Sequence, residues 1–251
     1  MSGHSKWSTI KRKKGVADAK RGAVFTRLAR EIVIAAREGG SDVDSNFRLR
    51  LAVDKARAEN MPKDNIERAI KRGAGEDKDG VVFEQITYEG YASHGVAVMV
   101  ETVTDNRNRT VSDLRHAFTK AGGTMAEPGA VGWQFERIAY FSFPSSMMSF
   151  DKAFELGIDV GANDVVDDNG TIEITAHVES FKVIADALHK AKVQPEEAGL
   201  RLHPKQEVEL SPNDTLQVLK ALETIEDLDD VQNVYSNLKV SDEALATLEA
   251  A

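Results

Sequence analysis

The chain has 251 residues, of which 41% are hydrophobic and 29% are charged, a composition typical of globular proteins with two or three domains. It contains no cysteine, which excludes disulfides, cysteine-ligated zinc and thiol nucleophiles. No apolar run approaches the roughly 18 residues of a membrane span, and no apolar segment follows the basic N-terminus as in a secretory signal. We therefore expect a cytoplasmic protein without a membrane partner.

Charge is divided by position along the chain. Through Arg72 there are 18 Lys and Arg against 9 Asp and Glu, a net charge of +9. The remainder has 14 against 32, a net of −18, which together give the −9 of the whole chain. A basic arm on an acidic body predicts that the arm meets a polyanion while the body stays soluble. A solvated tail with no specific partner stays open as the alternative.

The first third of the chain is predicted to be helical. One apolar stripe at helical spacing consists of Phe25, Leu28, Ala29, Ile32, Ala35 and Ala36. Three arginines lie off this stripe, namely Arg27, Arg30 and Arg37, and a glycine pair at 39–40 ends the helix.

Two shorter helices are expected to follow. The second begins near Asp44 or Ser45 and is broken at 61–62, and the third starts with Pro62 in its first turn and ends at Gly73. The glycine-rich, charged segment 73–80 is predicted to be a flexible linker.

After residue 80 the pattern alternates between strands and helices. Strands are predicted at 82–88, 95–103, 164–168, 171–176, 198–203, 206–210 and 231–235, with two more inside 131–143 and a turn at 90–94. Helices are predicted after Thr110, at 149–156, at 179–191 and after Ser211. The sequence therefore predicts an α+β multi-domain protein, with helices layered on mostly antiparallel sheets of ferredoxin-like character.

The basic residues provide the first candidate site. Lysine and arginine on an arm and the helix after it can neutralise phosphates, and Trp7 can stack on an exposed base. The predicted nucleic-acid-binding residues are Lys6, Trp7, Lys11, Arg12, Lys13, Lys14, Lys20, Arg21, Arg27, Arg107 and Arg109.

The last two arginines belong to a polar segment, 104–110, between a predicted strand and a predicted helix. Thr110 is expected to cap this helix, with Asp113 three residues later as in a capping box. Unpaired N–H groups at the helix start, beside Arg107 and Arg109, would form an anion site. A polar loop whose side chains satisfy its own backbone stays open as the alternative.

Catalytic and metal-binding patterns are weak. Ser8 and Lys11 match a four-residue pattern of serine hydrolases, but its partner motif is missing. The histidines lack metal-ligand spacing, and no glycine-rich phosphate loop is present. The acidic run at 223–230 is expected to be a solvated helix end or a contact for a basic partner. We therefore expect a protein that is not an enzyme and uses no cofactor or metal.

Seven strings carry a family resemblance: GHSKW at 3–7, DAKRG at 18–22, AAREGG at 35–40, NMPKD at 60–64, IERAIKRG at 66–73, YEGY at 88–91 and TDNRNRT at 104–110. In this order they resemble the YebC family, which includes the PmpR-type regulators and the mitochondrial translational activator of cytochrome c oxidase subunit I. The resemblance implies three domains: a basic helical domain at 1–76, a discontinuous α/β domain at 77–133 and 206–251, and an inserted α/β domain at 134–205.

The resemblance also implies a function. It points to a nucleic-acid-binding regulator of gene expression that is not an enzyme, most directly a DNA-binding transcriptional regulator. The alternative is a translation factor associated with RNA or the ribosome. Since no helix carries a clear set of base-reading side chains on one face, the ribosome stays open. The residues do not fix an oligomeric state, and a monomer is compatible with them.

Overall fold

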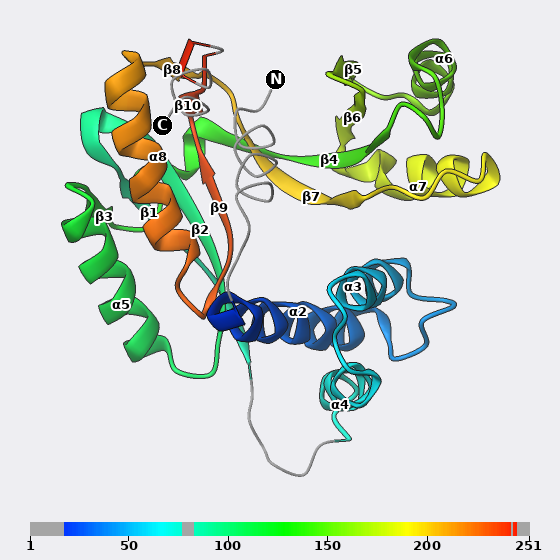
Figure 1. Ribbon diagram of the computed structural model, residues 1–251, viewed down its shortest axis with the longest axis horizontal. Helices are drawn as coiled ribbons and strands as arrows, with labels where there is room; N and C mark the ends of the chain where they lie inside the picture. The colour runs from blue at the N-terminus through cyan, green and yellow to red at the C-terminus, as the bar shows by residue number, and fades with distance from the viewer. Residues whose placement is uncertain (1–17, 77–82, 242, 245–251) are drawn as a thin grey trace. The chain divides into compact units, whose positions relative to one another are not determined.

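The computed structural model describes residues 18–76, 83–241 and 243–244 (Figure 1). The predicted basic arm and the second half of the predicted linker at 73–80, residues 77–80, lie outside these ranges. Internal contacts divide the chain into two compact units, one formed by Phe135–His203 and the other by the residues before and after it. The smaller unit is therefore an insertion into the larger one.

Three helices form the first part of the larger unit: α2 (Asp18–Gly39), α3 (Phe47–Ala58) and α4 (Lys63–Gly73). The predicted start of the second helix was early, because the cap is Asn46, whose side chain accepts from the Leu49 N–H at 3.0 Å. The third helix ends at Gly73 as predicted, but Pro62 is its N-cap and not part of its first turn, which begins at Lys63.

The three helices share one apolar core. It includes Ile32, Val33, Leu49, Val53, Ile66 and Ala69. Helix α4 lies very close to α2 at its end, where a Cβ added to Gly73 would come within 2.5 Å of the Val33 carbonyl oxygen. Glycine is thus required there by close approach of two backbones.

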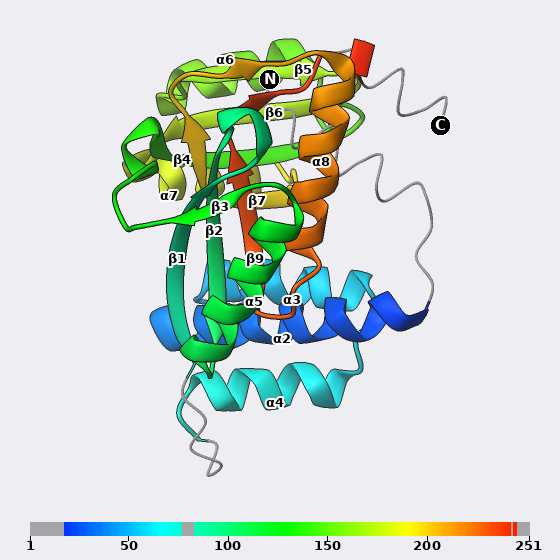
Figure 2. The ribbon, with the colours of Figure 1, turned by 90° about the vertical axis from the view of Figure 1, so that its left-hand side faces the viewer.

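The rest of the larger unit is a four-stranded antiparallel sheet covered by two helices. Its strands are β1 (Glu84–Tyr91), β2 (Ala97–Thr104), β3 (Thr124–Ala126) and β9 (Val231–Ser236), in the order β3-β1-β2-β9. Helices α5 (Arg107–Lys120) and α8 (Pro212–Glu226) lie side by side against this sheet (Figure 2). All eight residues of β2 are buried, as expected for a central strand.

Strand β9 follows the inserted unit in the sequence. It pairs antiparallel with β2, so the chain after the insertion returns to the sheet formed before it. Helix α8 begins as predicted, with Ser211 as the cap and Pro212 in the first turn. A short parallel pair, β8 (Val208–Glu209) with β10 (Leu238–Lys239), completes the unit.

The structure corrects the prediction around the first hairpin. The expected turn at 90–94 begins later, because β1 runs through Gly90 to Tyr91 and only Ser93–Gly95 form a short 3-10 helix. A Cβ at Gly90 would lie 2.6 Å from the ring of Phe118, so this glycine marks close packing of α5 on the strand. Strand β3 was not predicted, and the two strands expected within 131–143 are one strand and a 3-10 turn, Gly132–Gln134.

The inserted unit contains β4 (Phe135–Pro144), α6 (Phe150–Val160), β5 (Asp164–Asp168), β6 (Thr171–His177), α7 (Phe181–Lys190) and β7 (Glu197–Pro204). Its sheet order, β5-β6-β4-β7, is that of a ferredoxin-like split βαβ fold. The predicted fold class is thereby confirmed: an N-terminal helical domain is followed by α/β parts with antiparallel sheets. The exact boundaries at 1–76, 77–133 with 206–251, and 134–205 stay a prediction.

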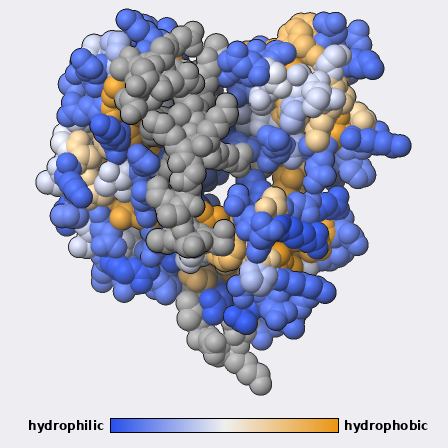
Figure 3. Space-filling model, in the orientation of Figure 1, coloured by the Kyte–Doolittle hydropathy of each residue, from blue (hydrophilic) through white to orange (hydrophobic). Residues whose placement is uncertain are grey.

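One face of α6 is apolar and exposed. The helix packs inward through the small residues Ala153 and Gly157 and presents Phe150, Phe154 and Ile158 outward. Figure 3 shows hydrophobic colour at the end of the inserted unit that carries α6, as well as in other patches on the same face. No helix among the described residues has the length and apolar character to cross a membrane.

Candidate nucleic-acid interface

The predicted site residues fall into three groups in the structure. Six of them lie outside the described residues: Lys6, Trp7, Lys11, Arg12, Lys13 and Lys14. Lys20 and Arg21 belong to the first turn of α2, and Arg27 lies further along this helix. Arg107 and Arg109 are both exposed residues in the first turn of α5.

Helix α2 contacts the acidic end of α8 through two arginines. The Nη2 of Arg27 donates to the Glu226 carbonyl at 2.7 Å, and the Nη1 of Arg30 donates to the Asp229 carbonyl. The Nη2 of Arg30 also lies 2.9 Å from Oδ1 of Asp230. Arg30 was expected off the apolar stripe, yet its side chain is only 10% exposed because the sheet domain covers it. The helical bundle is thus joined to the sheet domain by arginine contacts.

Asp230 is the centre of this contact. Its Oδ2 accepts from Thr110 at 2.7 Å and from Thr104 at 3.1 Å, and Arg109 donates to its Oδ1 at 2.9 Å. Burial alone would raise the pKa of Asp230, but the Thr110 and Arg109 hydrogen bonds and the nearby arginine charges outweigh it and lower the pKa. The expectation of a solvated acidic run is therefore wrong for Asp230, and the basic partner of this residue is the chain itself.

The polar segment 104–110 is folded differently from the prediction. Asn106 is the cap of α5, and its Oδ1 accepts from the Arg109 N–H at 3.1 Å. Thr110 is not a cap; it lies within the helix and is buried. Its hydroxyl is used for Asp230, so the helix begins four residues earlier than the sequence suggested.

The two arginines of this segment differ in their surroundings. Arg109 lies 2.8 Å from Asp105 and 2.9 Å from Asp230, and hydrogen bonds to Asp105 and Asp230 raise the pKa of Arg109. Arg107 lies near Tyr88, whose pKa is raised by burial against the opposing charge of Arg107. These contacts give Arg27 and Arg109 structural roles, and contact with nucleic acid remains a prediction for both.

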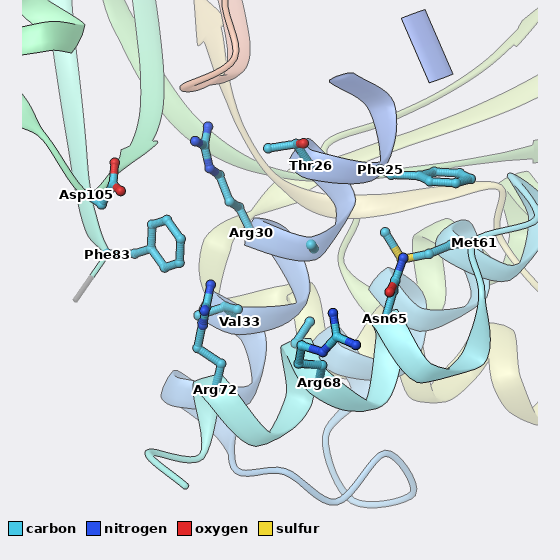
Figure 4. A pocket seen from close by; sticks show the side chains of 12 residues that line it. Phe25, Thr26, Arg30, Val33, Met61, Asn65, Arg68, Arg72, Phe83 and Asp105 are labelled. Atoms are coloured by element: carbon cyan, nitrogen blue, oxygen red, sulfur yellow. The ribbon is translucent and has the colours of Figure 1, made fainter. Parts of the chain in front are cut away.

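A hollow of about 400 Å³ opens between α2, α4 and the residue before β1 (Figure 4). Its apolar lining comes from Phe25, Ala29, Val33, Met61, Ala69 and Phe83. Its polar lining comes from Thr26, Arg30, Asn65, Arg68, Arg72 and Asp105. The hollow therefore combines aromatic and aliphatic walls with three arginines.

A second hollow, of about 460 Å³, lies beside Asp230. Its lining includes the carboxylates Asp105, Asp113, Asp227 and Asp229, which makes it unsuited to a phosphate group. Among the described residues, no group of three or more His, Asp or Glu side chains is placed to hold a metal ion.

The sequence prediction missed the residues that line the first hollow. Arg68 and Arg72 follow Asn65 at three and seven residues, and Phe25, Ala29 and Val33 are spaced by four. Both sets define a helix face, and this spacing was the available signal. Phe83 belongs to neither helix pattern, because it lies after the segment 77–82, directly before β1.

Two family models match the chain: TACO1/YebC protein N-terminal domain over residues 5–76, and TACO1/YebC second and third domain over residues 83–238. A probable transcriptional regulatory protein of Geotalea uraniireducens is 54% identical over 245 residues, with 98% of each chain covered. Another, of Geobacter sulfurreducens, is 50% identical over 248 residues, covering 99% of this chain and 100% of that protein.

A solved structure is also similar. It is the crystal structure of a conserved hypothetical protein from Aquifex aeolicus, with a TM-score of 0.81 and 42% sequence identity. The similarity covers 90% of this chain and 93% of that one. With both family models matched in order along nearly the whole chain, this protein belongs to the TACO1/YebC family.

Proposed function

We propose that this protein is a nucleic-acid-binding regulator of gene expression without catalytic activity, acting on DNA in the cytoplasm as a transcriptional regulator. The observation that carries the proposal is the charge division, +9 through Arg72 against −18 beyond it. The names of the relatives, probable transcriptional regulatory proteins, support the same role.

The contacts inside the larger unit indicate which cations remain for a partner. Arg27 and Arg30 are used by the end of α8, on the side of the bundle that faces the sheet domain. Helix α4 presents Arg68 and Lys71 as exposed residues, whereas its exposed Lys63 lies 3.5 Å from Oε1 of Glu67. Since the acidic body repels phosphates, a polyanion is expected to approach through α4 and the basic arm.

The ribosome is the second candidate target. Contacts between lysine or arginine and phosphate carry no base sequence, so they fit ribosomal RNA as well as duplex DNA. The hollow between α2 and α4 favours RNA, because unpaired bases are common in folded RNA. Crosslinking in cells followed by sequencing decides between promoter DNA and ribosomal RNA.

The binding role is tested by changing Lys11, Arg12, Lys13 and Lys14 together to Ala. Affinity should fall for all sequences alike, and the slope of log K against log salt should flatten by roughly 0.7–0.9 for each phosphate that the arm no longer neutralises. The matched control removes the same charge by changing four exposed lysines elsewhere, Lys152, Lys182, Lys190 and Lys220. An arm variant with the salt slope of the unchanged protein would reduce the arm to a solvated tail.

A further inference from the structure

We propose that the hollow between α2 and α4 binds one unpaired nucleotide, with the base against its apolar lining and the adjoining phosphates at Arg68 and Arg72. The inference rests on the proposed nucleic-acid-binding function and adds to it a place and a class of ligand. None of the residues that carry it belongs to the basic arm.

The apolar part of the hollow suits a flat ring. Figure 4 shows Phe25 and Met61 at one end and Phe83 at the other, with Val33 between them on α2. Phe25 is only half-buried, so part of its ring is available to a ligand. Aromatic side chains at this exposure are the surfaces on which unpaired bases stack.

Phe83 forms a fixed wall. Its ring lies beneath two guanidinium groups, with Arg30 5.7 Å and Arg72 5.8 Å from the ring centroid. Its carbonyl accepts from the Nη1 of Arg37 at 2.7 Å. Because three arginines of the bundle hold this one residue, the end of the hollow is preorganised, which lowers the cost of ordering on binding.

The charges around the hollow favour an anion. Arg68 is exposed, and within the described part of the chain it has no acidic group at ion-pair distance. The one carboxylate in the lining, Asp105, is paired with Arg109 at 2.8 Å. Arg30 is paired with Asp230, so Arg68 offers the principal charge to a ligand, and Arg72 adds to it from over the Phe83 ring. A planar apolar group beside negative charge is the chemistry of a nucleotide.

The accessibility of a base determines whether paired or unpaired nucleic acid can enter the hollow. In a duplex each base is stacked and paired, and its ring faces are not accessible to Phe25. The hollow is about 400 Å³, within the range of small-molecule sites, and has the amide of Asn65 in its lining to contact a base edge. We therefore expect single strands, loops or bulges to bind through this site, and fully paired DNA to bind without it.

The test uses the full chain and labelled single strands of one sequence, as RNA and as DNA. In each strand a single abasic position is moved along the sequence, and affinity is measured by fluorescence anisotropy. Removing the base at one position should weaken binding roughly tenfold, about 1.4 kcal/mol, within the range of base–aromatic stacking. A larger loss with RNA than with DNA would identify RNA as the source of the nucleotide.

Three variants assign the loss to the hollow. Phe25→Leu should abolish the dependence on that base, whereas Phe154→Leu, an exposed phenylalanine of α6, should keep it. Arg68→Gln should weaken intact and abasic strands alike and more than Lys71→Gln, which removes one charge from α4 outside the hollow. Since Arg68 is exposed, its variant remains informative if Phe25→Leu lowers the melting temperature.

The failures are distinguishable. Tight binding of strands with no penalty at any abasic position would overturn the nucleotide site and leave the proposed function in place. A base dependence that survives Phe25→Leu would also overturn it. Absence of binding to RNA, single-stranded DNA and duplex DNA would overturn the proposed function and the site together.

Discussion

Removal of the Asp230 carboxylate should strongly destabilise the larger unit. In Asp230→Ala the guanidinium of Arg30, whose side chain is 10% exposed, would stay buried without its partner at 2.9 Å. Losing one member of a buried ion pair costs about 3–5 kcal/mol. Arg109 is 45% exposed, so water screens its attraction to Asp230.

The effect should also depend on pH. Because the pKa of Asp230 is lowered in the folded protein, its stabilisation is complete above the unfolded value of about 3.9. It is lost as the pH falls through the folded value. The difference in unfolding free energy between the wild type and Asp230→Ala should therefore be constant near neutral pH and shrink in acid.

Urea unfolding measures the loss of unfolding free energy in Asp230→Ala. Hydrogen exchange measured by mass spectrometry shows which segments of the chain lose stability. Peptides of α2 and β9 should lose protection in Asp230→Ala, whereas peptides from 135–203 serve as an internal reference. Asp229→Asn is the matched control, because this exposed carboxylate has the same charge and its backbone carbonyl is kept. A loss below about 1 kcal/mol, with α2 still protected, would refute the role of the pair in joining bundle and sheet.

Two further changes test close packing and a buried acceptor. Gly73→Ala places a Cβ 2.5 Å from the Val33 carbonyl oxygen and should cost about 1–3 kcal/mol by overpacking, whereas Gly22→Ala, with open space around it, should be neutral or stabilising in thermal melts. Glu89 accepts three backbone N–H groups of the 129–132 turn, which outweigh burial and lower the pKa of Glu89. Glu89→Gln should therefore loosen this turn at neutral pH, seen as altered Trp133 fluorescence, and acid should produce the same change in the wild type; unchanged emission would count against it.

The spacing of apolar residues, together with helix caps and helix-breaking residues, predicted most of the fold. The stripe of α2, the proline before α4 and the serine cap of α8 act over a few residues, and each was located from the sequence. The start of α3 was missed because several residues before it are good caps. Asn46 is selected by tertiary contacts, since its amide donates to the carbonyls of Ala35 and Gly40 at 2.8 Å each.

The candidate site was less predictable than the fold. Charge identified the arm, but the partner of Arg30 is Asp230, and no local pattern links residues so far apart. Thr110 and Asp230 are also far apart in the sequence, so their hydrogen bond was not predicted, and the local pattern assigned Thr110 as a helix cap. Phe83 gains its place only when the sheet domain meets the bundle, so the aromatic wall of the hollow is a product of tertiary structure.

The late position of Asp230 has a consequence for synthesis of the chain. Arg30 leaves the ribosome roughly 200 residues before its carboxylate partner, which at about 5–20 residues per second is an interval of about 10–40 s. The inserted unit, whose strands are contiguous in sequence, can fold during that time, whereas the sheet that receives β9 cannot be completed. A chain ended before β9 would retain an arginine prepared for burial without its counter-charge, and such a product is expected to be a substrate for proteolysis.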